Sequence, residues 1–189
     1  GANGGATLVD AKYFYCITYT KLSGTTISNE LICYDIESWT EVSRKAIPLT
    51  TISTDMTWNP ADQKVYGAFY NTTKNGYVFG TLDLETGAVN KLSDITLQDD
   101  KGYPAGFVVI AANSIGEVYG ISQMGDLYKF NTEDGSYSLI GATGYTPLYQ
   151  QSGCFDFTTK QLYWAACNEN SSGIYQVNTD TGEATLLGS

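Results

Sequence analysis

A motif that recurs four times at nearly constant spacing limits the fold of this chain more than any other feature. Each copy joins an apolar, tyrosine-rich stretch to a short polar segment that begins with Asp or Asn. These Asp and Asn residues are Asp35, Asp83, Asn131 and Asn178, at intervals of 48, 48 and 47 residues. A fixed period of this length is typical of repeat architectures, in which each copy is one supersecondary unit.

Each unit divides into four short strands separated by turn residues. In the second unit we expect strands at 55–58, 65–70, 77–84 and 88–92. Asp83 can accept hydrogen bonds from backbone amides two residues further on, and Gly87 can adopt the positive φ that closes the hairpin. Because the first unit has Trp39 in place of this glycine, we expect its turn to be distorted.

Four antiparallel strands in a repeat of this length match the blade of a β-propeller, which has roughly 40–50 residues. We therefore predict an all-β fold: a single repeat domain over 1–189 that forms a β-propeller of four four-stranded antiparallel blades. The blades are expected at approximately 5–48, 51–95, 104–142 and 150–188. A β-sandwich or another stacked arrangement is the alternative. The propeller could be a small closed ring, an open one, or part of a larger propeller, and open blade edges invite self-association.

The composition points the same way and excludes several partners. Charged residues make up 16% of the chain, and its net charge is −10 with no cluster of Lys or Arg. Nucleic acids and anionic membranes need a basic surface, so neither is expected as a partner. No apolar run approaches the roughly 18 residues of a membrane-spanning helix. Many Thr, Tyr, Gly and Asn residues suit strands and turns, and this composition is typical of extracellular proteins.

Histidine is absent from the sequence. Its absence excludes Ser-His-Asp and Cys-His catalysis and any zinc site built on imidazole. We therefore expect no catalytic residues and no cofactor.

The repeat resembles that of a known class of propellers. The pattern begins with a Leu-Tyr or Val-Tyr pair, continues with Tyr-x-x-Asp-x-x-Thr-Gly and ends in Leu-Gly, as at Leu187-Gly188. This pattern is similar to bacterial propeller repeats, many of them from secreted and surface proteins of gut Bacteroidetes. The resemblance covers nearly the whole chain and implies a propeller fold and an extracellular, cell-surface or periplasmic location. It implies no particular function. The sequence lacks the Gly-His and Trp-Asp pairs of WD40 repeats and the docking Trp of quinoprotein dehydrogenases.

Binding residues are expected on the face that carries the loops between the second and third strands of each blade and between successive blades. These loops are longer and more variable than the turns at the other end. The candidate ligand-binding residues are Tyr103, Tyr145, Tyr149 and Trp39, and the candidate calcium ligands are Asp94, Asp99 and Asp100. Acidic and aromatic side chains together suit sugar rings or a cation. The alternative is that the acids are solvated and the tyrosines pack loops onto blades.

The four cysteines occur as two pairs on neighbouring predicted strands. Folding the hairpin about 24–25 places Cys16 opposite Cys33, and Cys154 and Cys167 flank the turn at 158–161. Opposed cysteines on antiparallel strands can form disulfides, which favour an oxidising compartment. The alternative is four buried thiols that act as small apolar side chains.

Three functions follow from this sequence. The first is a non-catalytic secreted or cell-surface binding module for a glycan or a protein. The second is a structural spacer in a larger surface protein. The third is a glycan-active enzyme, which requires two carboxylates roughly 5–9.5 Å apart in one cleft. Asp55, Asp126 and Asp156 are the candidates for such a pair.

Overall fold

A computed structural model describes residues 2–189 of the chain, and these residues form sixteen strands in four antiparallel sheets. The first sheet contains β1 (Ala2–Val9), β2 (Tyr13–Leu22), β3 (Thr25–Asp35) and β4 (Thr40–Ala46). The second contains β5 (Thr51–Asn59), β6 (Lys64–Asn71), β7 (Gly76–Leu82) and β8 (Val89–Ile95). The third contains β9 (Phe107–Ala112), β10 (Val118–Ser122), β11 (Asp126–Phe130) and β12 (Tyr137–Ala142). The fourth contains β13 (Ser152–Asp156), β14 (Gln161–Cys167), β15 (Ser172–Val177) and β16 (Ala184–Gly188).

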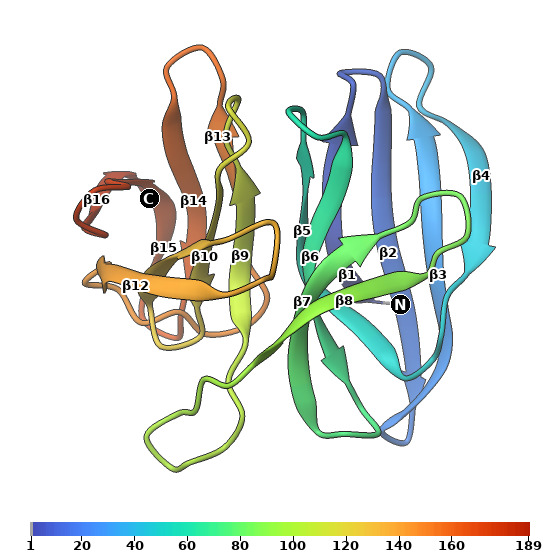
Figure 1. The fold of residues 1–189 in the computed structure, drawn as a ribbon, viewed down its shortest axis with the longest axis horizontal. Helices are drawn as coiled ribbons and strands as arrows, with labels where there is room; N and C mark the ends of the chain where they lie inside the picture. Colours follow the sequence, from blue (N-terminus) through green and yellow to red (C-terminus); the bar gives the residue numbers. More distant parts are fainter. Residues whose placement is uncertain (1) are drawn as a thin grey trace.

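The four sheets are the blades of a four-bladed β-propeller, as the repeat predicts. Within each sheet the strands pair in chain order, and β1–β8 lie in one half of Figure 1 while β9–β16 lie in the other. The first strand of every blade is the inner one. Consecutive inner strands pack directly, β1 on β5, β5 on β9 and β9 on β13, whereas β13 and β1 both line a cavity. The sheets run over 2–46, 51–95, 107–142 and 152–188.

The recurring Asp and Asn residues close the hairpin between the third and fourth strands of each blade. The Asp83 Oδ1 atom accepts hydrogen bonds from the amides of Glu85 and Thr86, both at 2.8 Å, and Gly87 has a φ of +74°. The turn at Trp39 keeps only part of this pattern. The amides of Gly87, Gly135 and Gly182 each donate to the carbonyl of the leading Asp or Asn, and among the described residues the Trp39 amide makes no such bond. Asp35 accepts the same two hydrogen bonds there, and Trp39 adopts a φ of +52°. The Asx turn therefore holds even a bulky residue in the left-handed region.

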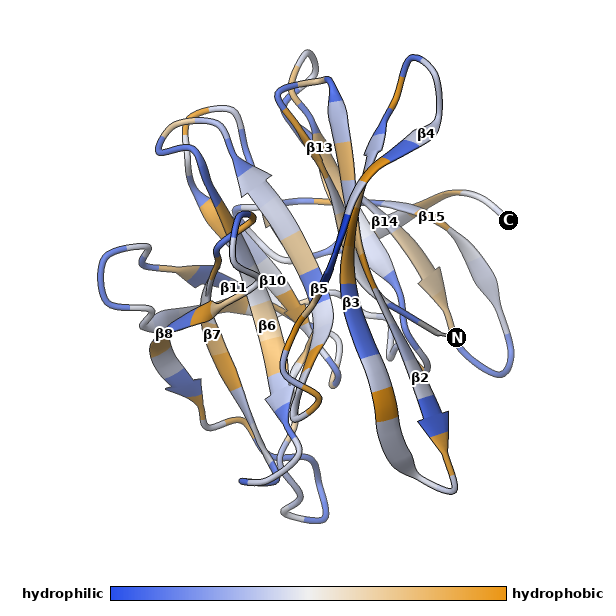
Figure 2. Cartoon of the chain, turned by 90° about the vertical axis from the view of Figure 1, so that its right-hand side faces the viewer, coloured by the Kyte–Doolittle hydropathy of each residue, from blue (hydrophilic) through white to orange (hydrophobic). Residues whose placement is uncertain are grey.

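Each of the three interfaces between consecutive blades contains one hydrophobic cluster. The cluster between the first two blades includes Ile17, Val65 and Phe69, and the next one is built on Phe79, Phe107 and Phe130. The cluster between the last two blades is centred on Trp164, which is fully buried. Figure 2 shows the apolar bands along strands such as β6 and β7. Burial of this apolar surface between blades is the main stabilising term of the fold.

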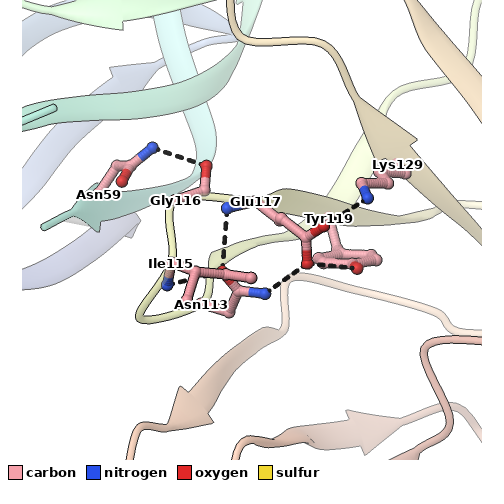
Figure 3. A network of polar contacts seen from close by, with 7 residues as sticks. All are labelled: Asn59, Asn113, Ile115, Gly116, Glu117, Tyr119 and Lys129. Atoms are coloured by element: carbon pink, nitrogen blue, oxygen red, sulfur yellow. Dashed lines mark hydrogen bonds and ion pairs between the residues drawn. The ribbon is translucent and has the colours of Figure 1, made fainter. Parts of the chain in front are cut away.

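A polar network joins the second and third blades beside their first turns (Figure 3). The Asn59 side-chain amide donates a hydrogen bond to the Gly116 carbonyl at 3.0 Å. Glu117 accepts hydrogen bonds from Asn113 and from the Tyr119 hydroxyl, and it forms an ion pair with Lys129 at 2.6 Å. The Lys129 ammonium is the largest cause of a lowered pKa for Glu117. The Asn59–Gly116 hydrogen bond joins the two blades, and the contacts of Glu117 stabilise the first turn of the third blade.

No helix in the described part of the chain has the length and apolar character needed to cross a membrane.

Candidate functional site

The predicted loop face contains a cavity of about 650 Å³, here called the loop-face cavity. Its floor includes Thr54 of β5 and Val108 of β9, and its walls come from the β8–β9 loop, the β10–β11 turn and the β12–β13 loop. The lining residues are Thr54, Asp99, Asp100, Pro104, Ala105, Val108, Gln123, Met124 and 146–150. A cavity of this size, at the end of the inner strands of a propeller, can hold a small ligand.

The β12–β13 loop is held in place by hydrogen bonds to the fourth blade. The Leu148 amide donates to the Cys167 carbonyl at 2.9 Å, and the Gln151 side-chain amide donates to the Leu148 carbonyl at 2.8 Å. The Asn168 side chain donates to the Thr146 carbonyl at 3.1 Å. Because the loop is anchored at both ends, the side chains between them are presented at fixed positions.

Tyr149 is the most unusual residue of this loop. Its side chain is 65% exposed, yet its backbone has a φ of +72°. This left-handed conformation is uncommon for a bulky residue and costs roughly 1–2 kcal/mol. An exposed aromatic ring that is kept at such a cost beside a cavity is typical of a binding site.

The opposite wall is the β8–β9 loop, which Asp99 organises. Its Oδ1 atom accepts hydrogen bonds from the amides of Lys101 at 2.9 Å and Tyr103 at 2.8 Å. Gln123 joins this loop to the β10–β11 turn, because its Oε1 atom accepts a hydrogen bond from the Gly106 amide at 3.0 Å. The neighbouring Asp100 also lines the cavity. Asp99 therefore shapes the wall, and Asp100 supplies charge to the cavity.

The structure brings together only part of the predicted ligand-binding set. Tyr149 lines the cavity, whereas Tyr103 is 66% exposed and lies outside the lining. Tyr145 packs edge-on against Trp164 with ring centroids 5.4 Å apart, so it belongs to the core of the last blade interface. Trp39 lies in the β3–β4 turn, at the opposite end of its blade, and contacts Phe14 at 6.1 Å between ring centroids. For Tyr145 the packing alternative is the correct one.

The prediction of a calcium site on three aspartates was wrong. Asp99 and Asp100 lie at the cavity, but Asp94 is at the end of β8 and forms an ion pair with Lys91 at 2.6 Å. Among residues 2–189, no group of three or more His, Cys, Asp or Glu side chains is arranged to hold a metal ion.

The predicted disulfides are also wrong, because both hairpins have a different register. Cys16 pairs with Ile32, and Cys33 pairs with Tyr15, so the two thiols point to opposite faces of the sheet. Cys154 pairs with Tyr163, four residues before Cys167. All four cysteines are free thiols, and only Cys33 is fully buried.

These free thiols lead to a simple prediction. Protein denatured without reductant is expected to react with a thiol reagent at all four cysteines, because neither register permits a bond. Counting the titrated thiols checks this, with a reduced and desalted sample as the reference. A value near zero or two in the unreduced sample would contradict the structure.

The three aspartates considered for catalysis do not converge. Asp156 lines a second cavity, at the other end of the inner strands, where its carboxylate accepts hydrogen bonds from Thr158 and Thr159. Asp55 is 1% exposed and lies inside the protein, and Asp126 lines neither of these two cavities. No two of them form the carboxylate pair that a glycosidase needs.

Asp55 links three inner strands near the centre of the molecule. Its Oδ2 atom accepts a hydrogen bond from the Ile110 amide of β9 at 2.8 Å, and its Oδ1 atom accepts one from the Ser152 hydroxyl of β13 at 3.1 Å. On β1, a Cβ added to Gly5 would lie 3.1 Å from the Asp55 Cα atom, so glycine permits this close approach. Burial raises the pKa of Asp55 well above its usual range.

Several lining residues were not predicted from the sequence, including Pro104, Gln123, Met124, Pro147 and Leu148. Gln123 and Met124 lie in a short turn between β10 and β11, and no composition signal marks them. The signal that could have found Pro147 and Leu148 is their position beside Tyr149 in a long connection between blades.

No protein-family model matches this chain, and no curated protein matches it either. Solved structures do match. A protein of unknown function from Bacteroides thetaiotaomicron aligns over 97% of this chain and 42% of its own, with a TM-score of 0.64 and 11% identity. A nidogen/laminin complex aligns over 92% of this chain and 60% of the other, with a TM-score of 0.63 and 16% identity.

An enzyme is also among the similar structures. Virginiamycin B lyase from Staphylococcus aureus aligns over 99% of this chain and 55% of its own, with a TM-score of 0.56 and 16% identity. The chain thus spans about half the length of these solved structures. At such low identity the likeness shows the fold alone, and this fold carries both binding proteins and enzymes. The chain is therefore similar to propeller proteins in architecture, and the evidence for its function comes from the residues that line its own cavities.

Proposed function

We propose that this chain is a non-catalytic binding module that holds a glycan in the loop-face cavity. The observation that carries the proposal is the exposed Tyr149 ring, which a strained but anchored loop presents at the cavity. Sugar rings have apolar C–H faces that stack on aromatic rings and hydroxyl groups that need polar partners.

The rest of the lining meets both needs of a sugar. Pro104, Met124, Pro147 and Leu148 supply apolar surface, while Asp100, Gln123 and Gln150 supply hydrogen-bonding groups. No Lys, Arg or His is among the lining residues, so neutral glycans fit the cavity better than sulfated or phosphorylated ones. An extracellular, cell-surface or periplasmic location agrees with such a ligand and stays a prediction from the composition.

Binding is tested by a thermal-shift screen against plant and host glycans, followed by calorimetric titration. A glycan at 100 times its dissociation constant should stabilise the fold by about 2.7 kcal/mol. The Tyr149→Ala variant is expected to bind at least about tenfold more weakly, because it loses the stacking surface. The matched control is Tyr103→Ala, which removes an equally exposed ring outside the cavity and should bind like the wild type.

Two results would contradict this proposal. Equal affinity of wild type and Tyr149→Ala would place the glycan elsewhere. If no glycan class binds, a protein ligand or the spacer role becomes the better account.

Tyr149 also gives a stability prediction. Tyr149→Gly is expected to raise the free energy of unfolding by up to about 1 kcal/mol, because glycine adopts a φ of +72° without a steric clash and the lost ring is largely exposed. Tyr149→Ala keeps the backbone strain and should gain nothing. Urea denaturation of both variants checks this. A clear loss of stability in Tyr149→Gly would show that the ring has a structural role.

A further inference from the structure

A second cavity, of about 630 Å³, lies at the opposite end of the inner strands and is here called the turn-face cavity. All four blades contribute to it, through the ends of β1, β5, β9 and β13 and the turns that follow three of them. The lining residues are Thr7, Leu8, Asp10, Ala11, Thr57, Trp58, Pro60, Ala112 and 154–158. The two cavities share no lining residue, and the buried Asp55 lies between Thr54 of one and Thr57 of the other.

The walls of the turn-face cavity are aromatic and apolar. Trp58, Phe155 and Phe157 supply rings, and Leu8 adds an aliphatic side chain. Leu8 and Phe157 remain 45% and 47% exposed, so the cavity leaves large apolar side chains in contact with water. Phe155 packs on Tyr119 with ring centroids 5.5 Å apart, which fixes one wall. A ligand that covers this surface would gain hydrophobic stabilisation.

The charge of the cavity is of one sign. Asp10 and Asp156 are its only charged lining residues. Hydrogen bonds from the Thr159 hydroxyl and the Thr158 amide lower the pKa of Asp156, so this carboxyl is ionised at neutral pH. Lys12 lies in the same turn as Asp10, and Lys160 in the same turn as Thr158, but neither lysine is among the lining residues. The Lys12 ammonium lies over the Tyr13 ring.

We propose that the turn-face cavity binds small organic cations with an apolar body, such as aromatic or quaternary amines. Aromatic rings attract a cation through the negative charge on their faces, and the two carboxylates add Coulombic attraction. Apolar walls cover the body of the ligand. Anionic ligands are repelled by the same carboxylates, and by the net charge of −10 on the whole chain. This site is independent of the glycan site on the loop face.

Binding can be followed at two residues inside the cavity. The fluorescence of Trp58 reports binding in a Trp39→Phe background. This substitution removes the exposed indole, so the only other tryptophan is the fully buried Trp164. Cys154, an exposed thiol in the lining, reports by protection from alkylation with iodoacetamide. The probe is benzyltrimethylammonium, compared with its neutral isostere neopentylbenzene and with the anion phenylacetate.

We expect saturable quenching of Trp58 and protection of Cys154 by benzyltrimethylammonium, about tenfold weaker binding of the neutral isostere, and no response to phenylacetate. Equal binding of the cation and its isostere would overturn the proposal, because it would show an apolar cavity without charge selection. Absence of both signals with the cation would overturn it as well. Glycan binding at the loop face is measured separately and changes neither conclusion.

The double variant Asp10→Asn with Asp156→Asn tests the two carboxylates. Asn59 and Asn113 cap the equivalent turns of the second and third blades through their Oδ1 atoms, as Asp156 does in the fourth. Asn also tolerates the positive φ of Asp10. The variant should therefore fold, and it is expected to bind the cation about tenfold more weakly while binding the neutral isostere unchanged. The control is Glu169→Gln, an exposed carboxylate outside the cavity. An equal loss of affinity for the cation in the double variant and in Glu169→Gln, or no loss in either, would contradict a role of Asp10 and Asp156 in cation binding.

Discussion

The Asp55→Ala variant is expected to lose about 3 kcal/mol of its free energy of unfolding. The substitution leaves the buried Ile110 amide without an acceptor and removes the link to Ser152 across the inner strands. It also leaves an empty space at a position that is 1% exposed. Urea denaturation measures the loss. The control Ser152→Ala removes only one of the two links from an exposed residue and should cost less than about 1 kcal/mol.

Asp55→Asn separates the charge of this group from its shape. The folded pKa of Asp55 lies above its unfolded value, so between the two values the folded state binds more protons than the unfolded state. The contribution of Asp55 to stability is therefore fully present below about pH 4 and is lost as the pH rises through the raised folded pKa. Asn keeps the acceptor for Ile110 and can donate to the Ser152 hydroxyl, but it does not titrate.

We therefore expect the difference in unfolding free energy between Asp55→Asn and wild type to shift in favour of the variant as the pH rises from 4. The slope is at most about 1.4 kcal/mol per pH unit. Subtracting the two curves cancels the exposed carboxyls with lowered pKa values, such as Asp35 and Asp83, which act in the opposite direction. A difference that stays constant from pH 4 to 8 would show that Asp55 is not held in an apolar environment.

Gly182→Ala is expected to destabilise the protein by about 3 kcal/mol. Gly182 has a φ of +88°, and a Cβ atom added to it would lie 2.5 Å from the Gly141 carbonyl oxygen of the neighbouring blade. Because the clash is with backbone, it can be relieved only if the last two blades move apart. Thermal and urea denaturation measure the loss.

Gly24→Ala is the matched control, since Gly24 has a similar φ of +81° with no atom within 4 Å of the added Cβ. It should cost only the backbone strain, about 1 kcal/mol. Equal costs at the two positions would show that the last two blades do not pack as closely as described.

The repeat was enough to predict the blades, because its signals are local. Asp83 and Gly87 mark a hairpin through hydrogen bonds and a φ value that lie within five residues. Strand register is less local. The register of β2 and β3 shifts between Thr20 and Lys21, and a one-residue slip is enough to place Cys16 and Cys33 on opposite faces. No sequence signal marks such an irregularity, so the predicted pairing of Cys16 with Cys33 failed. The register of β13 and β14 has no shift, and the position of their turn pairs Cys154 with Tyr163 instead of Cys167.

The candidate site was predictable only where it depends on loop length. The long connections between blades pointed to Asp99, Asp100 and Tyr149, which do line the loop-face cavity. The chain does not reveal that Tyr145 turns inward against Trp164, because the choice depends on packing within the fourth blade. The link from Asp55 to Ser152 spans 97 residues and arises only when the blades assemble.

The most direct test of the glycan-binding account is amide hydrogen exchange, with and without the glycan that gives the largest thermal shift. The account predicts slower exchange in the segments 99–105 and 146–150, which contribute lining residues to the loop-face cavity, and no change at the turns 10–12 and 157–160. Slower exchange confined to those turns, or no glycan that shifts the unfolding temperature, would contradict it.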